Sequence, residues 1–171
     1  MDILSELKID SSLNRKKKLA NYVSDNPDKF PELMEYFFSE DYRIAQRASN
    51  AVNMCVEKDN ALIEPYISRI IENLKSPAHD AVKRNSIRLF QFIDLPEEYC
   101  GDVADICFSY LDSEKEAIAV RAFSMTVLYN IAMKYPAIKD ELKMMIEDHL
   151  PYGSAGIKAR GKNILKMLEK I

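Results

Sequence analysis

The sequence has little glycine and no tryptophan, with 4 Gly among 171 residues. It contains no glycine-rich phosphate loop and no nucleophile elbow. No stretch approaches the roughly 18 consecutive apolar residues that a membrane-spanning helix needs. The charges nearly balance, at 24 basic and 27 acidic side chains, so the chain as a whole is not an obvious nucleic-acid or membrane-surface protein. Its 47% apolar content excludes intrinsic disorder.

Cysteine and histidine are also scarce. The three cysteines are odd in number and form no disulfide framework, which is typical of a reducing compartment. The first residues, MDILSELK, lack the basic-then-apolar pattern of a signal peptide, so we expect a cytoplasmic protein. His79 and His149 belong to no metal-ligand motif, and Asp102 and Asp105 lack further oxygen ligands nearby in the sequence. The sequence therefore predicts no catalytic residue, no cofactor and no metal site, and hence a protein that is not an enzyme.

What the chain does contain is helix-forming sequence from end to end. Ala, Leu, Lys, Glu, Met and Ile dominate, and the breaks fall at Pro, Ser, Asp and Asn. Helix starts are indicated by the capping residues Ser12, Asp59 and Ser113 and by Pro96 and Pro136 at first-turn positions. The short gaps predict antiparallel neighbours. Ten helices are expected, near 2–8, 12–24, 28–38, 41–58, 60–75, 78–93, 97–112, 115–135, 137–149 and 154–169.

Two independent series of residues repeat with the same step along the sequence. One is an arginine in the first helix of each pair, at Arg47, Arg84, Arg121 and Arg160, with spacings of 37, 37 and 39. The other ends each second helix, at Phe37, Leu74, Leu111 and Leu150, with the same three spacings. The two series lie on different helices and share the same spacings, including a last step that is two residues longer. This agreement predicts a repeated helical hairpin.

The residues around the third arginine resemble the HEAT repeat. Leu111-Asp112-Ser113 is followed after six residues by Val120-Arg121-Ala122, and the stretches from Ser76 to Arg84 and from Ser39 to Ala48 match more loosely. The resemblance covers about residues 40–170, although the usual early proline is absent from most first helices and Gly161 interrupts the last one. Armadillo repeats are similar, but the short gaps leave no room for their third helix.

This resemblance implies an all-α fold, a right-handed α-α superhelix (HEAT-like solenoid) of about four and a half helical hairpins. We expect one domain over residues 1–171. Its predicted parts are a degenerate N-terminal unit at 1–39, repeats near 40–76, 77–113 and 114–152, and a C-terminal capping helix at 153–171.

The apolar positions at helical spacing predict the core. Small side chains at Ala48 and Ala122 are expected to let adjacent hairpins approach closely. Phe92, Ile118, Ile131 and Ile138 are among the larger predicted core residues, and Cys100 and Cys107, seven residues apart on one helix face, are expected to serve packing. The recurring arginines allow two interpretations. Each either pairs with an acid or a carbonyl of the neighbouring unit, or forms part of a ladder that faces a ligand.

Charge separates by helix row. The first helices of the hairpins, counted with the flanking Glu40, Glu114 and Lys170, sum to a net +11 and the second helices to −9, with five acids and no base in the segment 97–112. In HEAT-like arrays the second helices usually line the concave side, which implies an acidic groove here. We expect its centre, Glu98, Asp102 and Asp105, to bind a basic peptide or helix, although an ordinary solvated surface would show mixed charges as well.

Two main function classes remain from the sequence. The first is a non-catalytic scaffold or adaptor that binds a protein or peptide through the second helices. The alternative is a nucleic-acid-binding module, since alkylpurine DNA glycosylases have a HEAT-like architecture. The basic segments Arg15–Lys18 and Lys158–Lys170 favour that alternative, whereas the acidic second helices and the lack of Trp disfavour it. Docking on a companion enzyme as a subunit is a third, weaker candidate.

Overall fold

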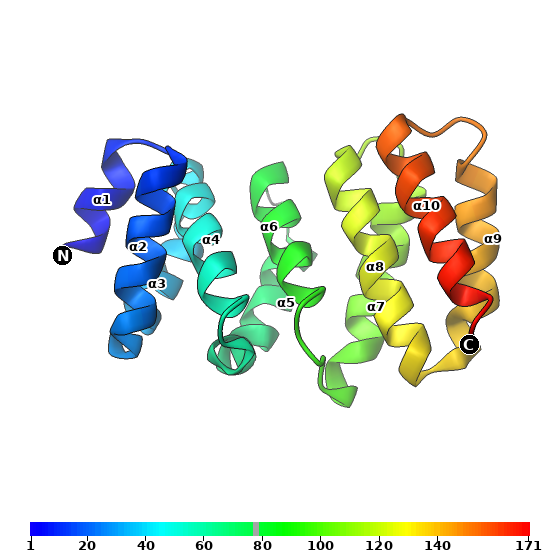
Figure 1. Ribbon diagram of the computed structural model, residues 1–171, viewed down its shortest axis with the longest axis horizontal. Helices are drawn as coiled ribbons and strands as arrows, with labels where there is room; N and C mark the ends of the chain where they lie inside the picture. The colour runs from blue at the N-terminus through cyan, green and yellow to red at the C-terminus, as the bar shows by residue number, and fades with distance from the viewer. Residues whose placement is uncertain (77–78) are drawn as a thin grey trace. The chain divides into compact units, whose positions relative to one another are not determined.

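The computed structural model describes residues 1–76 and 79–171. Over these residues every regular element is helical, with ten α-helices and three short 3₁₀ segments (Figure 1). Their order is α1 (Ile3–Ile9), α2 (Leu13–Asp25), η1 (Pro27–Lys29), α3 (Phe30–Phe37), α4 (Tyr42–Val56), η2 (Asn60–Tyr66), α5 (Ile67–Lys75), α6 (Asp80–Phe90), α7 (Glu97–Asp112), α8 (Ile118–Lys134), η3 (Pro136–Ile138), α9 (Lys139–His149) and α10 (Ala155–Leu168). The predicted all-α class is confirmed.

The helices divide into two compact units, which we call unit 1 (Met1–Phe92) and unit 2 (Ile93–Ile171). In unit 1, α2 packs against α4 and α4 against α6, while α3 packs against α4 from the second row (Figure 1). In unit 2, α8 packs against α7 and α10, and α9 lies against α8 and α10. Helices packed in sequential pairs are consistent with the helical-repeat solenoid that the spacing predicted.

Three of the second helices begin differently from the prediction. The expected helices 28–38, 60–75 and 137–149 each open with a 3₁₀ segment, namely η1, η2 and η3. Each segment contains a proline, at Pro27, Pro65 and Pro136. Pro65 lies inside η2, where its missing N–H prevents an α-helical hydrogen bond, whereas Pro27 and Pro136 open their segments, where an N–H would have no intrahelical partner.

The predicted start of one first helix is wrong. Ser113 caps the C-terminus of α7, and α8 begins at Ile118 after Ala117, so the start predicted at 115 is wrong. Asp59 does cap η2, because its carboxylate accepts a hydrogen bond from the Ala61 N–H at 3.1 Å. The start predicted at Ala78 lies outside the described residues, and α6 runs from Asp80 to Phe90.

The core follows the predicted apolar positions with two clear errors. Ala48 and Ala122 are buried between neighbouring helices as expected. Phe92 is 41% exposed because α6 ends two residues earlier, which leaves its ring beside the Arg88 guanidinium, 5.9 Å from the ring centre. Ile118 is 52% exposed because it is the first residue of α8 and has no preceding turn to cover it.

The three thiols, Cys55, Cys100 and Cys107, are buried and form no disulfide. Burial raises the pKa of each, and it brings the pKa of Cys107 to about 12. Protonated, enclosed thiols are poor nucleophiles, so packing is their role here. Over the described residues, no helix combines the length and the apolarity needed to cross a membrane.

Candidate functional site

The recurring arginines make contacts within the fold. Arg121 on α8 is 8% exposed and donates from Nε to the Leu111 carbonyl oxygen at 3.1 Å. Its Nη2 lies 3.2 Å from Nδ1 of His149, whose Nε2 is 3.6 Å from the Asp112 carboxylate. Leu111 lies in the last turn of α7, where a helix leaves carbonyls without intrahelical partners, so the arginine satisfies one of them.

Two other members of the series behave similarly. Arg47 donates to the carbonyl oxygen of Leu7 in α1 at 2.7 Å, and Arg160 on α10 donates to Oγ1 of Thr126 on α8. Arg84 is half-buried on α6. Three of the four arginines thus tie one helix to another, which supports the structural interpretation over a ladder that faces a ligand.

The predicted binding residues lie on α7. Glu98, Asp102 and Asp105 are all exposed, and their spacing of four and three residues places them on one face of the helix. Asp112 continues that face one heptad further on, and its side chain is also exposed. We call these four residues the acidic stripe. No basic residue lies within α7, so no cation on the same helix offsets their charge.

An exposed methionine stands at the corresponding place on the next second helix. The repeat step of 39 residues aligns Met144 on α9 with Asp105 on α7, and Met144 is 60% exposed. Glu141 and Asp148, which align with Asp102 and Ser109, are exposed as well. The second helices of unit 2 therefore present acids together with one flexible apolar side chain, a combination suited to a basic amphipathic partner.

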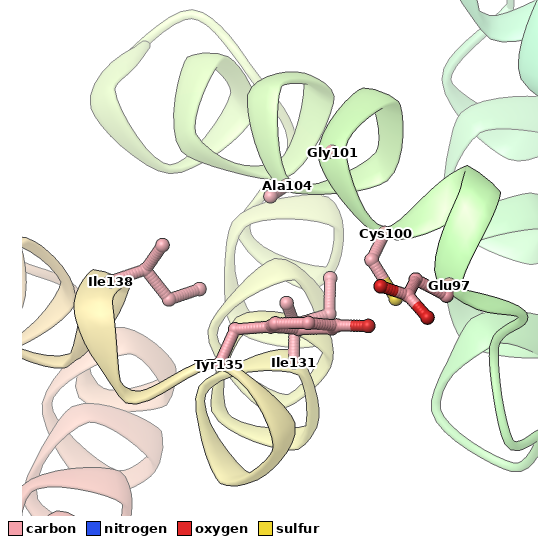
Figure 2. A pocket seen from close by; sticks show the side chains of 7 residues that line it. All are labelled: Glu97, Cys100, Gly101, Ala104, Ile131, Tyr135 and Ile138. Atoms are coloured by element: carbon pink, nitrogen blue, oxygen red, sulfur yellow. The ribbon is translucent and has the colours of Figure 1, made fainter.

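A groove runs beside the acidic stripe, with a volume of about 270 Å³. Its walls come from the first half of α7, the end of α8 and η3. Figure 2 shows the side chains of Tyr135 and Ile138 on one side and those of Ala104 and Cys100 on the other. The remaining lining residues are Glu97, Gly101 and Ile131. We call this cavity the α7 groove.

The α7 groove is apolar with one carboxylate at its rim. Partial burial raises the pKa of the Tyr135 hydroxyl, and the negative charge of Glu97 and its hydrogen bond with this hydroxyl add to the effect. In Figure 2 the Tyr135 hydroxyl points towards Glu97 and Cys100. The nearby cation, Lys134, pairs with Asp94 and donates to the Leu95 carbonyl oxygen at 2.9 Å. Its charge is therefore already balanced beside the groove.

Sequence reasoning missed this groove. It placed Ile131 and Ile138 in the core and Cys100 in packing, and it did not single out Glu97, Gly101 or Ala104. Ile131 and Cys100 are indeed buried, but Ile138 is only half-buried and forms part of the groove wall. The one available signal was Gly101, a weak helix former in the interior of a predicted helix.

The two basic segments differ in their surroundings. Arg15 and Lys18 on α2 form ion pairs with Glu6 of α1, and Arg15 pairs also with Asp10 at the end of α1, so these acids offset part of that charge. By contrast, Lys158, Lys162 and Lys166 on α10 and Lys170 just after it are exposed at a spacing of four residues. In the described part of the chain, no group of three His, Cys, Asp or Glu side chains is placed to hold a metal ion.

Sequentially paired helices, arginines that join neighbouring hairpins and an open acidic face together define an α-helical repeat protein. The family model for the HEAT repeat domain matches residues 3–168, so the chain belongs to the HEAT repeat family. No curated protein and no solved structure matches the chain. HEAT repeat domains are commonly protein-binding scaffolds and typically non-catalytic.

Proposed function

We propose that this protein is a non-catalytic scaffold or adaptor that binds a basic protein segment through the second helices of unit 2. The observation that supports this proposal most directly is the acidic stripe, in which Glu98, Asp102 and Asp105 share one exposed face of a helix without bases. Opposite charge would speed encounter and select among partners, while the apolar contacts hold the complex. The three unpaired thiols agree with a reducing cytoplasm as its place of action.

A charge-reversal experiment tests this function. In Asp102→Lys/Asp105→Lys, two exposed acids of the acidic stripe become bases, and we expect affinity for a fluorescein-labelled Lys/Arg/Ala peptide to fall by about tenfold or more. Fluorescence anisotropy at low and high salt measures the effect. The thermal midpoint should stay nearly constant because surface substitutions of this kind usually change stability by less than about 0.5 kcal/mol.

A control must distinguish the effect of the protein's net charge from the effect of charge at the acidic stripe. The matched control is Asp25→Lys/Glu40→Lys, which makes the same change in charge at two exposed positions of unit 1. Binding by this control should remain close to that of the unmodified protein. Equal losses in the two double variants would show that overall charge governs binding, and they would count against the acidic stripe as the contact surface.

Nucleic-acid binding stays the alternative because of the exposed lysines Lys158, Lys162 and Lys166 along α10. These lysines lie on a first helix, whereas the second helices of unit 2 carry mainly acids. A gel-shift titration distinguishes the two functions, since phosphate binding weakens steeply with salt. Salt-sensitive micromolar binding that is lost in Lys158→Glu/Lys162→Glu would favour the nucleic-acid function.

A further inference from the structure

Gly101 occupies an unfavourable place for a glycine. It lies in the interior of α7, where glycine is less favourable than alanine by about 0.5–1 kcal/mol. Its backbone does not need glycine, since its φ is not positive. A Cβ added at Gly101 would meet no atom within 4 Å, so no close approach of another element demands it either. Because Gly101 has no side chain, the wall of the α7 groove is open at this position.

Gly161 in α10 shows the contrasting case within unit 2. A Cβ there would lie 3.0 Å from side-chain atoms of both Ile146 and Leu150, so this glycine serves close packing of α10 on α9. Gly101 has no such packing reason, and it faces empty space beside Glu98 and Asp105, three residues before it and four after it. The opening therefore lies next to the acidic stripe.

The repeat provides an internal comparison in unit 1. Two steps of 37 residues align Pro27 and Phe30 with Gly101 and Ala104, and steps of 37 and 39 align Leu62 with Ile138. All three of these unit 1 residues line a groove of about 310 Å³. The acids of α3 and α5 have basic partners, since Lys29 pairs with Glu32, Arg69 with Glu35 and Lys75 with Glu72. In unit 2, by contrast, the groove borders α7, which carries five acids and no base.

We propose that the α7 groove is the anchor site of the scaffold: it takes one aliphatic or aromatic side chain of a basic peptide segment, whose neighbouring cations contact Glu97 and the acidic stripe. This inference rests on the proposed function and specifies its ligand. The volume of about 270 Å³ lies below the usual range of small-molecule pockets and suits a single side chain. The apolar floor of Ala104, Ile131 and Ile138 buries that side chain, and the carboxylates select the cations beside it.

The experiment uses two fluorescein-labelled peptides of Lys, Arg and Ala that differ only at the centre, where one carries Leu and the other Ala. Burial of one Leu side chain corresponds to about a 10- to 100-fold gain in affinity, so the Leu peptide should bind that much more tightly to the full chain. In Gly101→Leu the new side chain fills the groove, and this preference should disappear while weak, salt-sensitive binding of both peptides persists. Methyl NMR signals of Ile131 and Ile138 should shift with the Leu peptide.

Two controls keep the outcomes distinct. Ala61→Leu fills the corresponding groove of unit 1, where Ala61 is exposed, and it should leave the Leu preference intact. Circular dichroism of Gly101→Leu should show full helicity, and Gly101→Ala provides a second variant with a smaller intrusion and a reduced preference. Equal binding of both peptides to the unmodified chain, or a preference that survives Gly101→Leu, would overturn the anchor site while the acidic stripe stands. If Asp102→Lys/Asp105→Lys loses all peptide binding while Gly101→Leu leaves the binding of both peptides unchanged, the result supports the proposed function but not the anchor site.

Discussion

Arg121 illustrates how one buried cation holds a hairpin together. Its guanidinium lies within the core of unit 2 and donates to the carbonyl oxygen of Leu111, while a second nitrogen contacts His149. A buried charge is tolerated only where hydrogen bonds replace its hydration. Here those bonds also link the end of α7 and the end of α9 to α8. The side chain therefore contributes to stability, and a ligand would have to disrupt the core to reach it.

Replacement of this arginine should be costly. In Arg121→Ala the Leu111 carbonyl loses a charged donor, and we expect the free energy of unfolding to fall by about 1.5–3 kcal/mol. Urea unfolding followed by circular dichroism measures the loss. Arg43→Ala removes an exposed arginine that donates to the Tyr42 hydroxyl, and it should cost less than about 0.5 kcal/mol. Similar costs in both variants would contradict the structural role of Arg121.

The thiol of Cys107 predicts a pH dependence of stability. Burial raises its pKa from 9.0 to about 12, so the folded chain keeps the proton over a range in which the unfolded chain loses it. This contribution is complete below pH 9 and is lost as the pH rises from 9 towards 12, by up to about 1.4 kcal/mol per pH unit. Cys107→Ala lacks it, so the stability advantage of the unmodified chain over this variant should shrink between pH 8 and pH 10.5.

Urea unfolding of both proteins at each pH checks this difference. The other titrating groups are common to both chains and cancel, and the cavity left by the substitution costs the same at every pH. An advantage that stays constant across the range would show that the Cys107 thiol does not resist ionisation in the folded state.

At the scale of single helices, two glycines with different surroundings give opposite expectations. Gly101→Ala adds a methyl group where no atom lies within 4 Å, so the gain in helix propensity should stabilise the protein by about 0.5–1 kcal/mol. Gly161→Leu places a bulky side chain against Ile146 and Leu150 and should destabilise it by about 1–3 kcal/mol. Thermal unfolding of both variants measures the contrast, and a loss in Gly101→Ala would show that α7 needs glycine for its own geometry.

The helices themselves were predictable because the repeat and the apolar spacing both derive from local sequence. All ten α-helices were expected, and the ends of α7 were correct at Glu97 and Asp112. The 3₁₀ segment η2 was not, since over seven residues a period of 3.0 differs too little from 3.6 for the pattern to reveal it. The spacing of Glu98, Asp102 and Asp105 predicts that they share one helix face, and all three are exposed in the structure.

The α7 groove could not be predicted in the same way. It depends on which side chains of α8 and η3 come to face α7, and this is settled by tertiary packing rather than by the pattern within any one helix. Tyr135 and Ile138 lie more than 30 residues from Gly101 and Ala104, and nothing local to either segment indicates the pairing. Long-range contacts of this kind decide the sites of repeat proteins, whereas their helices follow from local patterns.

At the scale of the whole molecule, we propose that the predicted parts, from the degenerate unit at 1–39 to the capping helix at 153–171, behave as one array. In such arrays stability is nearly a sum of repeat and interface terms, and a short array unfolds cooperatively when its interfaces are strong. The division into unit 1 and unit 2 falls between α6 and α7, inside the repeat predicted near 77–113. Cooperativity across that division is therefore the property that would make the chain a single domain.

Hydrogen exchange can measure this cooperativity. Arg121→Ala destabilises unit 2, and if the chain unfolds as one array, amides of α4 in unit 1 should exchange faster by about the same factor as those of α8. The reciprocal variant is Arg47→Ala, which removes the donor to the Leu7 carbonyl oxygen in unit 1, and it should accelerate exchange in α8 in the same way. Faster exchange confined in each case to the substituted unit would mean that residues 1–92 and 93–171 fold as separate domains. The scaffold would then carry its binding face on an independently stable half.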